Sequence, residues 1–321
     1  MTPPYHITPE ILNLIAQVSE RIGAVQTAEL DRLTPQLRKR NQIKTIYNTL
    51  AIEGNALDQE QVTAIIEGKR VLGAEKDIIE VKNAVDVYAR MHTLNPSSPD
   101  DFLRAHKGLM AQLLPAPGRY RTSGVGISKG DEIQHFAPPH VRVPYLMKDL
   151  FGYLKSSEDH PLIRSAVFHY ELEFIHPFLD GNGRMGRLWH QLILANAYPV
   201  FQYLSLESLI RERQSEYYGA LSDSDKSGHS TPMILFSLHI IAQALGELDQ
   251  AKRSHLSSSD RLSYFLQNTS QLNFTRKDYM GCFRSISTAT ASRDLKQGVE
   301  DGLFDKIGTK NQSSYRRKKL P

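Results

Sequence analysis

The feature that most constrains this chain is the helical spacing of its apolar residues, which continues through most of the first 250 positions. At 8–10, TPE places a capping residue before a proline at the first helical position, and apolar residues then follow three or four apart. At 34–35, TP begins a second such helix, which is expected to end at the GN of 54–55. The pattern therefore predicts a mainly α fold.

Further helices are predicted at 58–67, at 75–94, at 100–115, from 141, at 161–175 and from 184. The segment 119–139 breaks this pattern, because β-type residues lie on both sides of Lys129-Gly130-Asp131. This arrangement predicts a β-hairpin. As the one convincing strand pair in a helical body, it is expected to be a projecting flap.

Composition changes at the polar stretch DQAKRSHLSSSD, which we interpret as a linker or a helix end. Three helices, at 259–267, 275–283 and 287–301, and then a β-ribbon are predicted after it. That order is typical of a winged helix-turn-helix. We therefore expect three parts: an N-terminal helical region at 1–98, a core at 99–250 and a winged helix at 251–321.

Charge and cysteine content limit the partners and the compartment. From His255 onward the chain has 12 Lys+Arg and 6 Asp+Glu, about +6, so only this tail suggests an anionic partner. The single cysteine, Cys282, excludes an internal disulfide framework and fits a reducing compartment. The N-terminus lacks the layout of a signal peptide, and we find no apolar run near the ~20 residues of a membrane span. A cytoplasmic protein without membrane contact is expected.

The stretch FIHPFLDGNGRMGR, at 174–187, carries most of the chemistry. A glycine-rich turn that enters a helix can direct backbone N–H groups at an anion, although an ordinary turn with a capping residue has the same sequence. Arg184 and Arg187 decide between these readings, because two cations in a first helical turn oppose the helix dipole unless they face an anion. Asp180 then fits a Mg²⁺ ligand and His176 a base, which together indicate phosphoryl or nucleotidyl transfer.

HPFLDGNGRMGR, at 176–187, resembles a complete signature of the Fic (Fido) family. The resemblance implies a helical core with a flap, and transfer of AMP from ATP to a Ser, Thr or Tyr hydroxyl. It also implies the following roles: His176 as general base, Phe178 as an anchor of the loop, Asp180 as the Mg²⁺ ligand, Gly181, Asn182 and Gly183 as an anion cradle, Arg184 and Arg187 as phosphate ligands, Val125, Gly126, Ile127 and Ser128 of the flap along the nucleotide, and Tyr217 and Tyr218 beside the adenine. From the residues alone, the two tyrosines could equally be core aromatics. Where Asp225 falls, family members often have Asn, so no contact is assigned to it.

TLAIEGN, at 49–55, resembles the inhibitory motif of the same family. Alone it would read as a helix end with a solvated Glu and a Gly stop. With the Fic signature present, it implies an inhibitory helix at about 36–54 whose Glu53 pairs with Arg187. Glu53 would then take the donor that the γ-phosphate needs, so the chain is expected to be autoinhibited. The resemblance also allows the reverse reaction, removal of AMP.

Several alternatives stay open at this point. The chain could be a DNA-binding regulator whose Fic core senses a nucleotide, or a Fic enzyme that transfers another phosphate-containing group such as UMP or phosphocholine. The winged helix could contact DNA or a protein through Arg293 and the basic run 316–319. A target protein along the flap, self-modification and a homodimer are the other expected partnerships.

Overall fold

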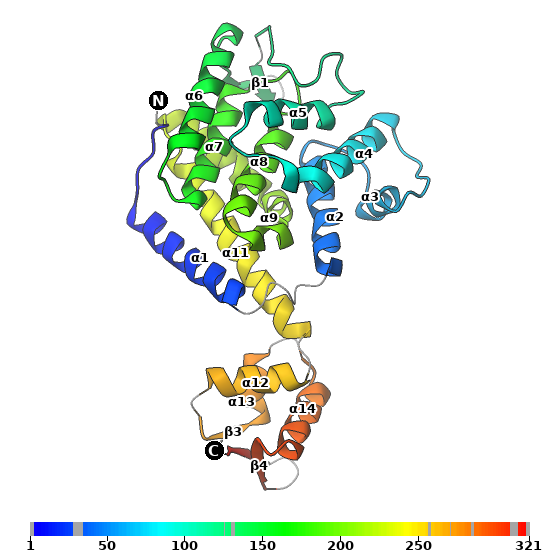
Figure 1. Cartoon of the computed structure of the whole chain (residues 1–321), viewed down its shortest axis with the longest axis vertical. Coiled ribbons are helices and arrows are strands. Elements are labelled where there is room, and N and C mark those ends of the chain that lie inside the picture. Colours follow the sequence, from blue (N-terminus) through cyan, green and yellow to red (C-terminus); the bar gives the residue numbers. More distant parts are fainter. Residues whose placement is uncertain are drawn as a thin grey trace. The chain divides into compact units, whose positions relative to one another are not determined.

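The structure is a computed structural model that describes residues 3–27, 35–124, 126–129, 132–255, 258–269, 271–283, 286–308 and 314–318. The chain divides into two compact units, Met1–Leu245 and Gly246–Pro321. Both units are mainly helical, and the described strands form two small sheets (Figure 1).

The first unit is built of helices with one hairpin. Two of the predicted helices begin beside capping side chains that were not singled out from the sequence: Asp58 accepts from the N–H of Gln61, and Ser98 from that of Asp101. The described elements are α1 (Pro9–Thr27), α2 (Pro35–Ile52), α3 (Gln59–Ile66), α4 (Glu75–Arg90), η2 (Met91–Thr93), α5 (Pro99–Leu109), β1 (Gly126–Lys129), β2 (Glu132–Phe136), η3 (His140–Arg142), α6 (Val143–Ser156), α7 (Pro161–Ile175), α8 (Asn182–Ala197), η4 (Pro199–Tyr203), α9 (Leu206–Glu212), α10 (Gln214–Ser227) and α11 (Thr231–His255).

The predicted end of α5 was wrong, since the helix stops at Leu109 and not near Pro115. Gln112 has a φ of 64°, which an α-helix does not allow. The chain then turns back, and Gly118 donates its N–H to Nδ1 of His106 at 2.9 Å. The helix end is thus accompanied by a contact between residues 12 positions apart, which no local signal in the sequence encodes.

The core of the first unit surrounds the antiparallel pair α7 and α8, which pack side by side (Figure 1). Trp189 of α8 has 0% of its surface exposed and meets Phe102 of α5 edge to face at 5.0 Å. Helix α6 covers α7, and α2 lies against both α8 and α9. The two central helices thus hold the ends of the loop 176–181 at fixed positions.

One segment of α11 corrects the expectation about apolar runs. Within the described residues, Thr231–Asp249 is long and apolar enough, by length and composition, to cross a membrane. In this fold, 61% of that segment is buried inside the protein. A core helix of a globular protein meets the same criterion, so a single such helix is weak evidence of a membrane span.

The predicted hairpin is present. Strands β1 and β2 pair antiparallel, with Gly126 opposite Phe136 and Lys129 opposite Glu132. The register shifts between Ile127 and Ser128, as at a β-bulge. Val125, Gly130 and Asp131 of the predicted flap lie outside the described residues.

The second unit has the predicted order of elements with one strand added. The sheet order is β3-β5-β4, and β3 was missed because three residues carry too little periodicity to detect. Asp294 is buried and accepts hydrogen bonds from Arg261 and Tyr279, which joins its three helices. The winged helix-turn-helix assignment stays a prediction. The elements are α12 (Ser258–Asn268), β3 (Asn273–Thr275), α13 (Arg276–Cys282), α14 (Thr288–Glu300), β4 (Phe304–Ile307) and β5 (Ser314–Arg317).

Gly186 provides a test of the α7–α8 contact. A Cβ at this position would lie 2.6 Å from Oε1 of Glu173 and 2.7 Å from Cδ2 of His169. We expect Gly186→Ala to lower the free energy of unfolding by about 1–3 kcal/mol, the usual effect of overpacking. Urea denaturation followed by the fluorescence of Trp189, the only tryptophan of the chain, measures the change.

The matched control is Gly219→Ala in α10, where a Cβ would meet nothing within 4 Å. There the better helix propensity of alanine should raise stability by up to about 1 kcal/mol. Equal effects at the two positions would contradict the packing described for Gly186.

Candidate active site

His176 ends α7 in a left-handed conformation, with φ 49° and ψ 62°. Its N–H still donates to the carbonyl of Leu172 at 2.9 Å. Among the described residues, Gln112 is the one other non-glycine residue with a positive φ. Such a conformation is unfavourable for a residue with a Cβ and persists only where the surroundings hold it. The half-buried His176 side chain is therefore held where the helix turns into the loop.

Arg121 supplies much of that restraint. It is buried, and its Nε donates to the carbonyl of His176 at 2.7 Å while its own N–H donates to that of Pro177 at 2.8 Å. Its guanidinium also donates to the carbonyls of Ser123 and Pro138, which flank the hairpin segment. One arginine thus joins the loop to the base of the flap. Sequence reasoning missed Arg121, since a lone arginine beside a predicted strand carries no signal of such contacts.

The glycine-rich turn closes through Asn182. The side chain of Asn182 accepts from the N–H of Phe178 at 2.9 Å and donates to its carbonyl at 3.0 Å. Gly181, with φ 88°, is the residue before α8, and a Cβ there would lie 2.8 Å from Sδ of Met110. Phe178 is 0% exposed, as expected of an anchor, and its ring stacks on His106 with centroids 3.5 Å apart. The backbone N–H groups at the start of α8 are thereby held in place.

His106 fixes the other end of the turn. Because its Nδ1 accepts the N–H of Gly118, its Nε2 carries the proton and donates to the carbonyl of Asp180 at 2.9 Å. Burial lowers the pKa of His106 to about 4, so the ring is neutral at neutral pH. Sequence reasoning did not find His106, because it belongs to a helix 74 positions from its partner.

The two arginines of α8 have different acidic partners. Arg184 pairs with Oε1 of Glu80 at 3.1 Å and with Oδ1 of Asp180 at 2.8 Å, and its side chain is buried. The Asp180 side chain is 47% exposed at the edge of the turn. Glu80, from α4, was not singled out from the sequence.

Arg187 is held by residues at the end of α2. Its Nε donates to Oγ1 of Thr49 at 2.9 Å, and one terminal nitrogen donates to the carbonyl of Thr49 at 3.0 Å and to Oε1 of Glu53 at 2.7 Å. Burial opposes the charge of Arg187, but the Glu53 carboxylate and its neighbours hold the pKa above its ordinary value. The structure thus contains the ion pair that the two sequence motifs imply.

The Glu53 carboxylate also occupies the glycine-rich cradle. A Cβ built on Gly183 would overlap Oε1 of Glu53, so the carboxylate lies directly against this glycine in the first turn of α8. The start of a helix favours a negative charge through its dipole and its unpaired N–H groups. An anion from the same chain therefore already fills the site that the sequence predicted for an anion.

A cleft of about 210 Å³ opens beside this pair. Glu53, His176 and Arg187 line it, as do both predicted tyrosines, Tyr217 and Tyr218. Tyr217 is 1% exposed and its hydroxyl hydrogen bonds Nε2 of His169 at 3.0 Å, whereas Tyr218 is 43% exposed. Tyr217 is therefore a core aromatic that also lines the cleft, and its place beside the adenine stays a prediction. Gly126, Ile127 and Ser128 belong to β1, and Val125 lies outside the described residues.

Metal ligands in this region are few. In the described part of the chain, no three His, Cys, Asp or Glu side chains are grouped so that they could hold a metal ion. His169 and Glu173 lie 3.7 Å apart inside the fold, where they take part in the packing of α7. Asp180 remains a single, partly exposed carboxylate beside the cradle.

Three buried histidines make the stability of this unit depend on pH. Burial lowers the pKa to about 4 for His106 and to about 3 for His169 and His190. Unfolded histidine titrates near 6.5, so below that pH the unfolded chain binds more protons than the native one. We expect the free energy of unfolding to fall as the pH drops from about 6.5 toward 5, by up to about 1.4 kcal/mol per pH unit for each histidine.

Urea denaturation of the His106→Gln variant tests this at several pH values. The variant should lose part of the slope, because it removes one of the histidines whose pKa is lowered by burial. The control is His92→Gln, since the side chain of His92 is exposed. An unchanged slope in the His106 variant would contradict the assignment.

The curated relatives of this chain share one activity name. Residues 96–194 match the Fic/DOC family. Protein adenylyltransferase fic-1 of Caenorhabditis elegans is 34% identical over 194 residues, which cover 55% of this chain and 35% of that protein. Protein adenylyltransferase Fic of Nematostella vectensis is 28% identical over 202 residues, covering 59% and 45%. The chain thus spans less than half the length of these relatives.

Solved structures extend the similarity to the whole chain. A Fic family protein from Desulfovibrio desulfuricans G20 superposes with a TM-score of 0.76 at 40% identity, covering 100% of this chain and 99% of the other. Residues 134–508 of Fic-1 from C. elegans share the fold, with a TM-score of 0.61 at 22% identity over 77% of this chain and 73% of that one. This chain belongs to the Fic family.

Proposed function

We propose that this chain is a protein adenylyltransferase that moves AMP from ATP to a Ser, Thr or Tyr hydroxyl of a target protein, and that Glu53 inhibits it. The observation that carries the proposal is the ion pair between Glu53 and the buried Arg187, at the N-terminus of α8. A buried cation beside a helix start is a site for an anion, and the signature 176–187 surrounds it with the groups that nucleotidyl transfer needs. The names of the curated relatives support the same activity.

The chain's own groups bind the phosphates in this proposal. Arg187 and the N–H groups that begin α8 hold the outer phosphates, where the Glu53 carboxylate now lies. One half-exposed carboxylate, Asp180, fits Mg²⁺ that arrives on the nucleotide, since Mg²⁺ is usually held by one or two carboxylates together with substrate phosphates. Bound there, Mg²⁺ would offset phosphate charge during transfer.

The transfer itself assigns one proton to His176. The target hydroxyl oxygen forms a bond to the α-phosphorus, the bond from that phosphorus to the β-phosphate oxygen breaks, and pyrophosphate leaves. The hydroxyl proton goes to the His176 imidazole. The left-handed backbone of His176 and the hydrogen bond from Arg121 restrict where this ring can lie, and such positioning contributes strongly to transfer rates.

The target would be registered by the hairpin. A two-stranded sheet such as β1–β2 has an unpaired edge on each strand, and an extended peptide can add to such an edge. Arg121 joins the hairpin segment to the loop of His176, so a peptide aligned on the flap would be aligned on the base as well. A second copy of this chain is an alternative target, as in self-modification.

Inhibition follows from charge and space. With Glu53 on Arg187, the γ-phosphate loses its cationic partner and meets a carboxylate in the cradle. ATP that still enters is displaced, and its α-phosphorus is badly aligned for attack. The same engaged Glu53 could direct a water molecule at a modified target, which would remove AMP.

Replacing Glu53 tests the inhibition. We expect Glu53→Gly to raise transfer of label from α-³²P-ATP to protein by about 10- to 100-fold, because the γ-phosphate regains Arg187. The control is Glu60→Gly, which removes an exposed carboxylate from α3. Equal labelling of the Glu53 variant and the wild-type chain would rule the inhibition out.

Replacing His176 tests the base. In the Glu53→Gly background, His176→Ala should lower labelling by about 10²- to 10⁴-fold, the usual contribution of a general base. Binding of ATP, measured by calorimetry, should change little, since phosphate contacts remain. Label that persists in this double variant would overturn the assigned base.

The same assay separates the alternatives. Labelling with UTP or CDP-choline in place of ATP would indicate transfer of another group. Absence of label with every donor and variant would favour a DNA-binding regulator, for which exposed Arg293 in α14 and Arg316 in β5 offer phosphate contacts.

A further inference from the structure

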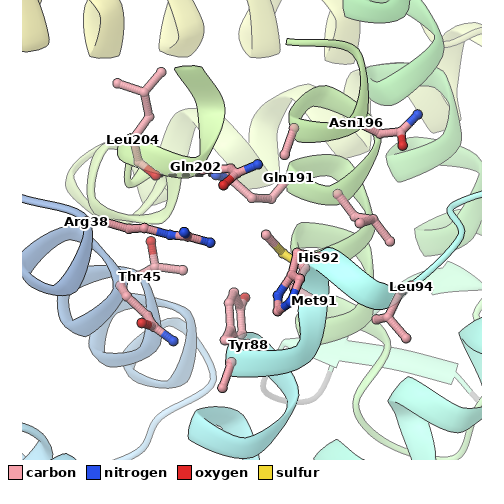
Figure 2. A pocket seen from close by; sticks show the side chains of 14 residues that line it. Arg38, Thr45, Tyr88, Met91, His92, Leu94, Gln191, Asn196, Gln202 and Leu204 are labelled. Atoms are coloured by element: carbon pink, nitrogen blue, oxygen red, sulfur yellow. Dashed lines mark hydrogen bonds between the residues drawn. The ribbon is translucent and has the colours of Figure 1, made fainter. Parts of the chain in front are cut away.

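A second cavity, of about 550 Å³, lies in the first unit between α2, the segment from α4 to Leu94, α8 and the η4 region. It shares no lining residue with the cleft that holds Glu53 and His176. Its volume is within the range of small-molecule sites. Figure 2 shows Arg38 reaching into it from α2, with Gln191 on one side and Tyr88 and His92 on the other.

The polar group that most needs a partner here is the side chain of Gln191, which is only 4% exposed. Its Nε2 donates to two carbonyls, those of Phe201 and Leu204. Flipping the amide would set its oxygen against both carbonyls, so the orientation is determined. Oε1 is then buried and accepts no hydrogen bond from the described residues. A buried acceptor without a donor is unfavourable. Because Gln191 lines the cavity, a small movement of its side chain would bring Oε1 to the cavity surface, where a ligand N–H or O–H would remove that cost.

The remaining lining defines the rest of the ligand. Arg38 brings a cation to the cavity lining. Its side chain is exposed, so it can pair with an anionic group of a ligand. Thr45 and Gln202 add polar groups, while Met91 and Leu192 are apolar. A compact organic anion with an apolar body and one hydrogen-bond donor satisfies this set.

The position of the cavity links it to the active site. Thr45 lies one helical turn before Thr49 on α2, and Gln191 lies one turn after Arg187 on α8. Thr49 and Arg187 are joined by two hydrogen bonds. A ligand that touches Arg38, Thr45 and Gln191 therefore contacts both helices beside the Glu53–Arg187 pair, and it finds all its partners only while α2 is docked.

We propose that this cavity is a regulatory site for a small organic anion that carries a hydrogen-bond donor, and that its occupancy holds α2 against α8 and so strengthens inhibition by Glu53. A ligand shifts an equilibrium toward the state that it binds better, here the docked one. Typical couplings between two sites change the affinity at the second site by about 5- to 150-fold. The inhibitory part rests on the proposed function, whereas binding and its effect on α2 do not.

Two probes represent the two chemical classes of such an anion, a phosphate and a carboxylate. Cytidine 5′-monophosphate carries a phosphate with an amine, and indole-3-acetate carries a carboxylate with an indole N–H. Methyl phosphate and indole each retain one half of that chemistry, and both carry the carbon-bound protons that saturation-transfer NMR observes. Saturation-transfer NMR on the full chain should detect at least one of the two anions at millimolar concentration, more strongly than either half.

A matched pair of variants locates the binding. Arg38→Met should abolish the signal, while Arg40→Met, which removes an exposed cation from the same helix outside the cavity, should retain it. Circular dichroism shows whether both variants stay folded. If neither anion gives a signal that depends on Arg38, the proposal is overturned and the cavity holds solvent only.

Two further measurements test the regulation. The bound anion should slow hydrogen exchange in the peptide 45–54, whether or not the chain transfers AMP. It should also lower labelling of the wild-type chain about 5-fold or more, and leave Glu53→Gly unaffected. Binding without slower exchange would overturn the regulatory part. Slower exchange in a chain that never transfers label would instead count against the proposed function alone.

Discussion

The buried guanidinium of Arg187 is the constraint on which the rest of this site depends. A buried cation without a partner destabilises a protein by about 3–5 kcal/mol, so this position requires an anion at all times. The protein meets that requirement with Glu53, which arrives from α2 and lies against Gly183. If Glu53 inhibits transfer as proposed, the same contact serves both inhibition and stability. Phosphates of a nucleotide would then displace the carboxylate by satisfying Arg187 in its place.

The loop beside this pair is held rigid by contacts that do not themselves touch the cleft. Arg121 holds the backbone of His176, Asn182 closes the turn on Phe178, and His106 binds the carbonyl of Asp180. Each contact fixes a backbone atom, so the reactive side chains start from a determined position. Neutral His106 is essential to this arrangement, because a protonated Nδ1 could not accept the N–H of Gly118. The low pKa that burial gives this ring thus preserves the geometry of the turn.

How much the sequence predicts here depends on whether a signal is local. Cap motifs and apolar spacing are local, and they predicted the helices around the site, the hairpin and the order of elements in the second unit. The pairing of Glu53 with Arg187 was implied only because two short motifs of one family occur together. Glu80, His106 and Arg121 were missed, since each meets its partner through the tertiary fold and has no neighbouring residue that marks it. The early end of α5 has the same cause.

Helix α2 contacts both α8 and α9, and it also leads to Glu53. The same helix therefore contributes to packing and to the proposed regulation. Its last turn presents Thr49 and leads to Glu53, while Asn48 donates to Ser208 and Arg211 lies over the ring of Tyr47 at 4.6 Å, so the helix is attached to α9 as well as to α8. In the proposed mechanism, the Glu53 side chain rotates away from Arg187 when phosphates take its place, and the helix itself need not leave. Anything that tightens the α2–α8 contact nevertheless favours the paired state, since Thr49 holds Arg187 oriented toward Glu53. The proposed inhibition therefore depends on the helix contact as well as on the carboxylate.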